Sequence, residues 1–287
     1  MDTRPVIVIT GATNGMGRLA ALDLARRDAH LGIVARSRRK ADALRQEIEQ
    51  AAPGTQVDIF LADLSLLAEV RRAGEEIAAH YPRIDVLINN AGLHAFSQRV
   101  TSEGYAEMTA VNYLAPWVLT DALRDKLIAS APARIVTVAS RASKQAGTID
   151  PLRDLADTAA FTRRGSSPLY GRSKLMDIMF TQELARQLQG TGVTVMCCCP
   201  GFNATGLGRE LPLAGALEKV LTALNIGNPQ HGADIIVKLA TDPDFADSTG
   251  GYFAAKTAKP LPCPEIGRSE TVQHALWQAT ADLVQGN

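Results

Sequence analysis

The sequence predicts an α/β fold, a doubly wound parallel sheet of about seven strands with helices on both faces, in three αβα layers. Short apolar segments alternate with longer amphipathic stretches along the 287 residues, which is the pattern of βαβ units. The strand segments are apolar at nearly every position, as is typical of strands that are buried on both faces. Since no repeat, low-complexity tract or linker interrupts the alternation, we expect residues 1–287 to form a single domain.

Seven segments are expected to be strands because they are short, apolar and rich in β-branched residues. They are Val6–Thr10, His30–Ala35, Val57–Leu61, Val86–Asn89, Arg134–Ala139, Val193–Cys199 and a short final segment, Gly251–Phe253. The longer stretches between them carry apolar residues at helical spacing. The expected helices are Gly17–Arg27, a charged helix at Arg38–Ala51 that stops before Pro53, Leu66–His80, one through Val111–Leu119, Leu169–Gln189, which ends at Gly190, and His231–Ala240.

Two segments are longer than this alternation requires. Residues 141–168 follow the fifth strand, and residues 202–230 follow the sixth. Both leave the carboxyl ends of strands, which is the edge where open α/β sheets bind their ligands. We therefore expect an active-site insert at 141–168 and a substrate loop or lid at 202–230.

Composition and charge exclude several classes of protein. The formal net charge is zero and the pI is near 7.0, whereas a nucleic-acid binder or a polybasic membrane anchor carries a basic excess. The apolar run Val6–Ile9 is too short for a signal peptide, and no stretch reaches the roughly 18 apolar residues of a membrane span. We expect a cytoplasmic protein that acts on a small molecule, without nucleic acid.

The four cysteines give no metal site. Cys197–Cys199 are consecutive within an expected strand, and neighbouring strand residues point to opposite faces, so the three thiols do not converge on one ion. Cys263 stands alone. Buried strand thiols are the expected state, and neither a zinc site nor a disulfide framework is predicted.

A glycine-rich turn follows the first strand directly and opens the first helix. Such a turn lets the backbone approach a pyrophosphate, and the helix N-terminus then supplies N–H groups and a favourable dipole. This context predicts a Rossmann-type dinucleotide site, with a ligand-free packing turn as the alternative. The residues expected to bind the cofactor here are Gly11, Thr13, Asn14, Gly15, Met16 and Gly17.

The second strand ends in a basic residue, which indicates the type of cofactor. A carboxylate at this point binds the ribose hydroxyls of NAD, but here Arg36 follows the strand and Arg39 and Lys40 lie close behind it. Arginine matches phosphate geometry, so NADP(H) is predicted, with Arg36 as the main ligand of the 2′-phosphate. The alternative is a solvated basic helix start. Asp63, after the third strand, is expected either to meet the adenine or to cap the next helix.

Tyr170 and Lys174 are four residues apart in an expected helix and so lie on one face. A nearby ammonium lowers a phenol pKa, so the pair can exchange a proton with a carbonyl or an alcohol. Ser140 ends the fifth strand, where its hydroxyl can bind the same substrate oxygen. Asn112 lies inside a helix although asparagine is a mediocre helix former, which indicates a polar task such as holding a water beside Lys174.

The chain resembles the short-chain dehydrogenase/reductase family. The elements that match are TGATNGMG, Asp63-Leu64, NNAG at 89–92, Asn112, Ser140, YGRSK at 170–174 and Pro200-Gly201 with Thr205. The resemblance implies a catalytic tetrad of Asn112, Ser140, Tyr170 and Lys174, with the last two also holding the nicotinamide ribose. It implies further cofactor contacts at Leu64, Asn90, Ala91, Gly92, Pro200, Gly201 and Thr205.

A narrower resemblance is to the retinol-dehydrogenase-like branch, through stretches such as VARSRRKADAL and LYGRSKLMDIMFTQELARQLQGTGVTV. It implies NADP(H) and a bulky, lipophilic or polycyclic ketone or aldehyde that is reduced to the alcohol, as by a biosynthetic or detoxifying ketoreductase. The alternatives are an NAD(P)-dependent alcohol dehydrogenase working oxidatively and a non-catalytic NADP(H) sensor.

The sequence leaves four features open. The chain shows no N-terminal apolar anchor, and the 202–230 segment matches no pattern of the branch. Relatives assemble through helices near Asn112 and Tyr170, so the chain is expected to be a monomer, a dimer or a tetramer. His94 follows the NNAG motif, and a loop residue without a task is favoured over one that faces the active-site cleft.

Overall fold

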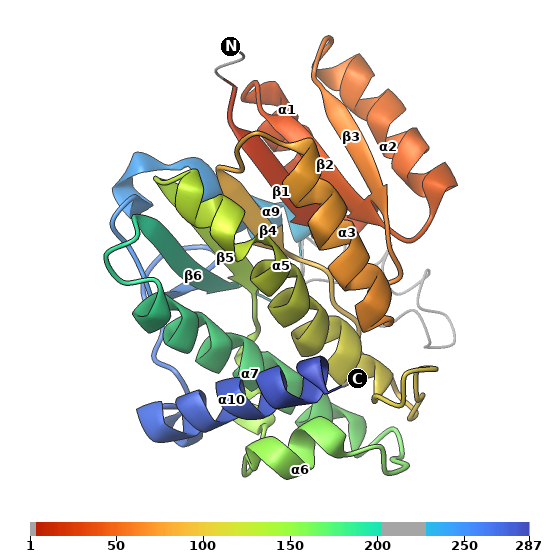
Figure 1. Ribbon diagram of the computed structural model, residues 1–287, viewed down its shortest axis with the longest axis vertical. Helices are drawn as coiled ribbons and strands as arrows, with labels where there is room; N and C mark the ends of the chain where they lie inside the picture. The colour runs from red at the N-terminus through yellow and green to blue at the C-terminus, as the bar shows by residue number, and fades with distance from the viewer. Residues whose placement is uncertain (1–3, 202–227, 287) are drawn as a thin grey trace.

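Seven parallel strands form one sheet in the computed structural model, which describes residues 4–201 and 228–286 (Figure 1). Their order is β3-β2-β1-β4-β5-β6-β7, so the predicted doubly wound sheet is confirmed. Because β1 pairs with both β2 and β4, the winding reverses beside β1, and this is where such sheets bind ligands. The bounds are β1 Val6–Thr10, β2 His30–Ala35, β3 Val57–Leu61, β4 Val86–Asn89, β5 Ala133–Val138, β6 Val193–Cys199 and β7 Tyr252–Ala254.

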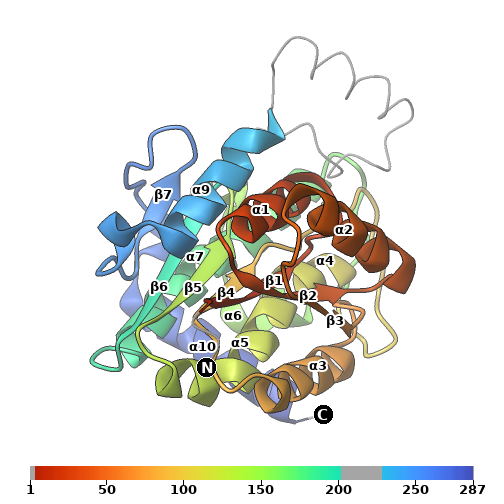
Figure 2. The same cartoon turned by 90° about the horizontal axis from the view of Figure 1, so that it is seen from above.

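Helices cover both faces of the sheet, and each face has its own hydrophobic core (Figure 2). The helices on one face are α1 Gly15–Arg26, α2 Arg38–Ala51 and α9 Pro229–Thr241. Those on the other face are α3 Leu67–His80, α5 Ala115–Ala129 and α7 Ser166–Gln187. The three predicted layers are therefore present. Five strands and α2 have the predicted bounds, and most other bounds differ by one to three residues; for example, α7 begins at Ser166 instead of Leu169. The helix predicted through Val111–Leu119 extends further, since α5 ends at Ala129.

A C-terminal helix, α10 (Glu270–Gln285), was not predicted. Its signal is present in the sequence, since Val272, Leu276 and Leu283 recur at helical spacing, and the Ser269 side chain accepts a hydrogen bond from the Val272 N–H. Trp277 stacks on Phe180 of α7 with ring centroids 5.8 Å apart. The helix thus lies across α7 on the outer side of the molecule (Figure 1) and buries part of that helix within the chain.

The active-site insert 141–168 contains two short helices, η2 (Arg141–Gln145) and α6 (Pro151–Ala156). The buried carboxylate of Asp154 fastens it to α7, accepting a 2.9 Å hydrogen bond from Arg172 Nη1 and one of 2.8 Å from the Asp150 N–H. The insert is therefore attached two residues from Tyr170. The predicted lid at 202–230 lies outside the described residues except for 228–230, and Thr205 lies outside them too.

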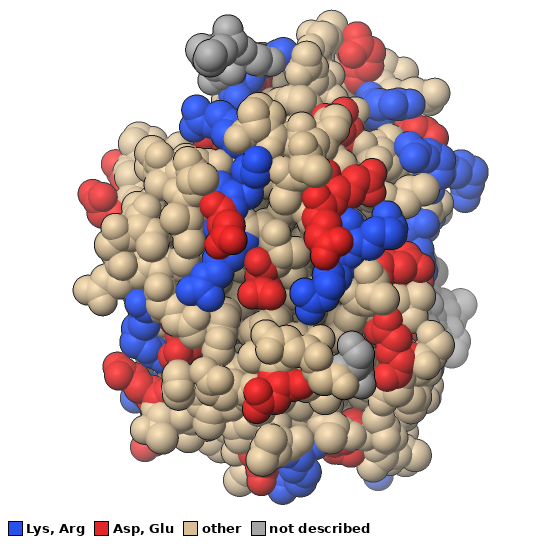
Figure 3. Space-filling view, viewed as in Figure 1, with Lys and Arg blue, Asp and Glu red and all other residues tan. Residues whose placement is uncertain are grey.

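The surface carries charges of both signs. On the face shown in Figure 3, basic and acidic side chains are interspersed. Among residues 4–201 and 228–286, no helix has the length and apolar character that crossing a membrane requires. Two short helices lie on either side of β7 in the sequence, η3 Pro243–Phe245 and η4 Glu265–Gly267.

Candidate active site

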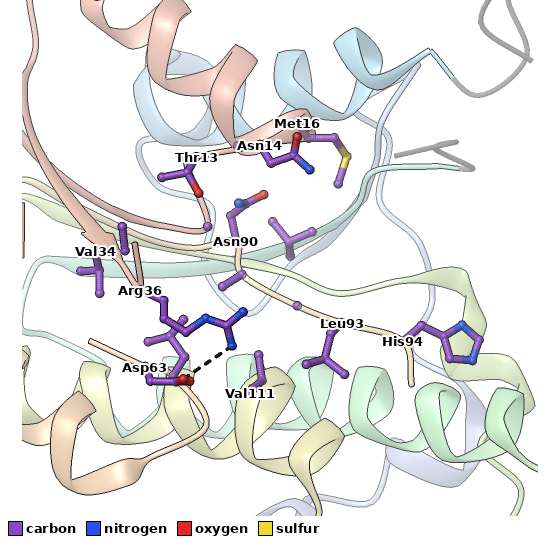
Figure 4. Close-up of a pocket in the computed structure, with 18 of the residues that line it drawn as sticks. Thr13, Asn14, Met16, Val34, Arg36, Asp63, Asn90, Leu93, His94 and Val111 are labelled. Atoms are coloured by element: carbon purple, nitrogen blue, oxygen red, sulfur yellow. Dashed lines mark hydrogen bonds and ion pairs between the residues drawn. The ribbon is translucent and has the colours of Figure 1, made fainter. Parts of the chain in front are cut away.

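A cavity of about 500 Å³ lies at the carboxyl edge of the sheet (Figure 4). It spans the point where the winding reverses and extends to α7. Most of the residues predicted to bind a cofactor line it together. They are Gly11, Thr13, Asn14, Gly15, Met16, Gly17, Arg36, Asp63, Leu64, Asn90, Ala91, Gly92, Tyr170, Lys174 and Pro200. Arg39 and Gly201 are described residues that do not line it.

The glycine turn after β1 packs so closely that it leaves no room for a side chain at Gly11 or at Gly17. A Cβ on Gly11, which has a φ of +68°, would lie 2.8 Å from Ala91 Cα, and one on Gly17 would lie 2.4 Å from the Gly11 carbonyl oxygen. Asn90 ties this turn to β4, since its Nδ2 donates to the Thr10 carbonyl over 2.9 Å. The backbone of the turn is thereby exposed to the cavity at a fixed position.

The N-terminus of α1 meets the same cavity. Within the described residues, the first turn of α1 contains no acidic residue, and the Asn14 side chain forms no capping hydrogen bond. The positive end of the helix dipole therefore faces the cavity without a carboxylate beside it. A glycine cradle at such a helix end fits the pyrophosphate of a dinucleotide.

Gly17→Ala should weaken NADPH binding by about tenfold or more, because the new Cβ meets the Gly11 carbonyl and the Asn90 amide, each at 2.4 Å. The overpacking should also lower the free energy of unfolding by about 1–3 kcal/mol. Cofactor fluorescence titration and thermal unfolding measure the two effects. Gly165→Ala is the matched control, since its nearest neighbour is 3.5 Å away. Equal NADPH affinity in the two variants would contradict the assignment of the glycine turn as the pyrophosphate site.

Arg36 and Asp63 meet at the end of the cavity next to β2 and β3. Arg36 Nη1 lies 3.5 Å from Asp63 Oδ2, and the Arg36 side chain is 74% exposed. Burial alone would raise the pKa of Asp63, but hydrogen bonds from Ser65 and the charge of Arg36 hold it below its usual value. Lys40, rather than Arg39, lines the cavity beside Arg36.

Asp63 does not cap the following helix, so that alternative is wrong. α3 begins at Leu67, and Asp63 Oδ1 accepts instead from the N–H and hydroxyl of Ser65, at 3.0 and 2.8 Å. The first N–H groups of α3 donate to the Glu103 carboxylate, 2.6 Å from the Leu67 nitrogen. The Asp63 carboxylate thus remains at the cavity wall.

Tyr170 and Lys174 project from one face of α7, and Ser140 follows β5 next to them. The Ser140 hydroxyl hydrogen-bonds the Tyr170 phenol and also accepts from the Ala142 N–H over 3.1 Å. Lys174 is buried, and its Nζ donates to the Val138 carbonyl and to Asp177 Oδ2, each over 2.8 Å. Tyr170 and Lys174 thus line the cavity, and the Ser140 hydroxyl hydrogen-bonds the phenol from its place after β5 without lining the cavity itself.

The phenol of Tyr170 holds its proton more firmly than the sequence suggested. Burial raises its pKa above the usual value. Lys174 and the hydrogen bond from Ser140 lower it, whereas Asp177 raises it further. The expected lowering by the ammonium is present but is outweighed by burial. In this environment the Tyr170 phenol is neutral at pH 7.

Asn112 lies in a π-helical turn, η1 (Ala110–Leu114), between the short helix α4 (Glu107–Thr109) and α5. π-turns within helices are frequent at functional sites. Its side chain bridges to the loop after β4, accepting from the Leu93 N–H over 2.8 Å and donating to the Leu93 carbonyl over 2.9 Å. A third bond, of 3.0 Å, runs from Nδ2 to Ser173 Oγ. The polar task of this side chain is therefore to fix the loop that passes Lys174.

His94 lines the cavity and stacks on the catalytic candidate Tyr170, with ring centroids 4.5 Å apart and planes 13° apart. Its Nε2 lies 3.2 Å from Ser166 Oγ. The Ser166 hydroxyl donates to the Arg163 carbonyl, so it accepts from a protonated Nε2. The structure therefore favours the reading in which His94 faces the cleft (Figure 4).

Sequence reasoning missed Asp177, which is buried and pairs with Lys174. Its signal was the i, i+3 spacing of a carboxylate and an ammonium on one helix. It also missed the cavity wall formed by Leu93, Val111 and the Arg99–Glu107 ion pair. These residues come from a loop and a helix that only the folded chain brings to the sheet edge.

Known proteins resemble this chain over most of its length. The family model described as short chain dehydrogenase matches residues 5–150 and 156–214. Human retinol dehydrogenase 13 is 35% identical over 284 residues, which cover 97% of this chain and 84% of the relative. A Streptomyces protein named "Putative daunorubicin C-13 ketoreductase DnrU" is 33% identical over 97% of this chain and 92% of its own.

A solved structure has the same architecture. The blue fluorescent protein from a metagenomic library, crystallised with NADPH, superposes with a TM-score of 0.68 at 27% identity, covering 88% of this chain and 97% of that one. The sheet order, the glycine turn and the match along most of the sequence lead to one conclusion: the chain belongs to the short-chain dehydrogenase family of oxidoreductases.

Proposed function

We propose that the protein reduces a bulky, lipophilic or polycyclic ketone or aldehyde to its alcohol with NADPH. The observation that carries this proposal is the neutral, buried phenol of Tyr170, which lies at the cavity beside Ser140 and Lys174. A phenol that keeps its proton at neutral pH suits the donor role in carbonyl reduction. The relatives named for retinol and for a polycyclic ketone support a large apolar substrate.

The residues that fit NADPH belong to the glycine turn and to the cavity wall on either side of it. The Gly11–Gly17 turn and the α1 N-terminus suit the pyrophosphate, while Arg36 and Lys40 suit the 2′-phosphate. Asn90, Ala91 and Gly92 extend the same wall, and Pro200 lines it after β6. The solved relative that was crystallised with NADPH supports this choice.

The chemistry then divides between the cofactor and the chain. When bound in this cavity, NADPH would supply the hydride for reduction of a carbonyl carbon. Tyr170 donates its phenolic proton to the carbonyl oxygen as the C=O π bond breaks, and the resulting phenolate regains a proton from solvent. Ser140 holds the same oxygen, Lys174 stabilises the phenolate, and Asn112 fixes the loop beside it.

The proposal is tested by following NADPH consumption over a panel of carbonyl compounds. The panel includes flat polycyclic ketones, retinal-like aldehydes and small ketones, and each is also tried with NADH. We expect turnover with NADPH on the bulky members and little on the small ones. Cofactor binding without consumption of any member would favour a sensor and overturn the proposal.

The retinol dehydrogenase relatives, up to 36% identical, favour a second candidate, which is oxidation of the corresponding alcohol. The same residues would serve, with Tyr170 accepting the proton. Measuring NADP⁺ reduction with the alcohol product of the best carbonyl substrate compares the two directions at one pH. A larger kcat/KM for the alcohol at pH 7 would select this second candidate.

A further inference from the structure

The buried carboxylate of Asp177 stands next to the proposed catalytic lysine. Oδ2 of Asp177 accepts from Lys174 Nζ over 2.8 Å, and both side chains are at most 5% exposed. Oδ1 is buried and has no hydrogen-bond partner within residues 4–201 and 228–286. Burying a carboxylate with one oxygen unpaired is unfavourable in solvation, so its place against Lys174 calls for a role.

Lys174 has three N–H donors, and two of them are already used. One donates to the Val138 carbonyl and one to Asp177. A single donor therefore remains for the cavity, where a ribose hydroxyl or the Tyr170 oxygen would accept it. Asp177 thereby fixes the rotation of the ammonium about its stem.

Within residues 4–201 and 228–286, Lys174 is the ion-pair partner of Asp177, and the effect of this carboxylate extends to Tyr170. Its charge also acts on Tyr113 from η1 and on Cys197 from β6. Burial raises the pKa of the Tyr113 phenol and of the Cys197 thiol, so both are neutral at pH 7. Lys174 and Asp177 are then the two opposed charges that act on the phenol.

We infer that Asp177 is a positioning residue that neutralises Lys174 and thereby keeps Tyr170 protonated, which adapts the site to carbonyl reduction. This inference rests on the proposed function for its catalytic meaning. Its electrostatic part does not depend on any substrate. Removing the Asp177 carboxylate leaves the positive charge of Lys174 without an opposite charge beside the Tyr170 phenol. The pair of Tyr170 and Lys174 then loses its shared proton at lower pH.

Burial raises the pKa of Asp177 to about 6, and Lys174 opposes that rise. The carboxylate is therefore charged at pH 7 and above, which is where Tyr170 must hold its proton. Conversely, Asp177 raises the pKa of Lys174 against the lowering by burial, so the ammonium also stays charged. Both charges are therefore in place from pH 7 upward, where the tyrosinate titration begins.

The first test follows tyrosinate formation by ultraviolet absorbance in the cofactor-free protein, with Tyr170→Phe subtracted in each background. In Asp177→Asn, the Tyr170 signal should appear about one pH unit or more lower than in the wild type. Glu183→Gln is the matched control, because it removes another buried carboxylate of α7 that pairs with Arg186 and His274. An unshifted Asp177→Asn titration, or an equal shift in Glu183→Gln, would overturn the inference.

Two further variants keep the test decisive if Asp177→Asn does not fold. Lys174→Met leaves the carboxylate alone and should give less tyrosinate than the wild type at about pH 10. Lys174→Met combined with Asp177→Leu removes both charges and should return the signal toward the wild-type level. A double variant that stays at the level of Lys174→Met would show that Asp177 does not act on the phenol.

The kinetic readout separates this inference from the proposed function. The readout is kcat/KM for NADPH-dependent reduction of the best ketone, measured as the pH is raised. The pH at which kcat/KM falls to half its maximum should be about one unit or more lower in Asp177→Asn than in the wild type. NADPH affinity at pH 6.5 should stay within about twofold. If the wild type reduces no carbonyl compound, the proposed function fails while the tyrosinate titration still judges Asp177. If reduction is found and neither profile moves, only the role of Asp177 fails.

Discussion

Tyr170→Phe should lower kcat for carbonyl reduction by about 10³-fold or more while NADPH binds as before. General acid catalysis by a positioned side chain typically contributes about 10²–10⁴-fold. The change removes the phenolic proton and the partner of the Ser140 hydroxyl, but it keeps the ring that stacks on His94. Single-turnover kinetics with NADPH measure the chemical step, and cofactor fluorescence measures binding.

Tyr81→Phe is the matched control for this prediction. It removes a phenol that donates to Asp58 Oδ2 over 2.8 Å, at the end of α3 away from the cavity. It should lower the free energy of unfolding by about 1–3 kcal/mol, since a partly buried carboxylate loses a hydrogen bond, and leave kcat within about twofold. If Tyr170→Phe retained more than about a tenth of wild-type kcat, another group would have to supply the proton.

The sheet and the cofactor cradle could be predicted because they are local in the sequence. The strands are continuous apolar runs, and Gly11–Gly17 lies between a strand and a helix in one short stretch. The tetrad positions came from a family pattern that fixes residue types at set places along the chain. The strands and the glycine turn depend on neighbours within a few residues, so a single sequence carries them.

The parts that could not be predicted depend on contacts between distant segments. His94 meets Tyr170 across 76 positions, through a stacking that needs the loop after β4 to turn toward α7. The Arg36–Asp63 pair joins the ends of two neighbouring strands, and its distance follows from sheet register, not from spacing. The π-turn at Asn112 was not predicted either, because a single wide turn inside a longer helical segment is too short to be recognised from apolar spacing.

The second large effect is expected on cofactor choice. Arg36→Ala should weaken NADPH binding by about 10- to 100-fold and leave NADH binding within about twofold. A charged hydrogen bond to phosphate is worth about 1.5–3 kcal/mol, and a factor of ten corresponds to about 1.4 kcal/mol. Cofactor fluorescence titrations with NADPH and NADH, side by side on both proteins, measure the ratio.

Neighbouring cations make this prediction specific. Lys40 lines the cavity next to Arg36, so Lys40→Ala should give a smaller loss of NADPH affinity in the same direction. Arg39 is exposed and does not line the cavity, so Arg39→Ala serves as the control and should change the NADPH to NADH ratio by less than about twofold.

The ion pair between Arg36 and Asp63 leads to a further prediction about the choice between NADPH and NADH. Asp63 Oδ2 holds Arg36 Nη1 at 3.5 Å, so a 2′-phosphate would compete with this carboxylate for the guanidinium. Asp63→Asn should therefore tighten NADPH relative to NADH by about threefold to tenfold, because it removes the competitor and a repelling charge. Opposite effects of Arg36→Ala and Asp63→Asn on one ratio would identify the pair as the selector of the phosphate. Equal NADH and NADPH affinities in the wild type would instead mean that Arg36 forms only a solvated surface pair, and that the enzyme uses either cofactor.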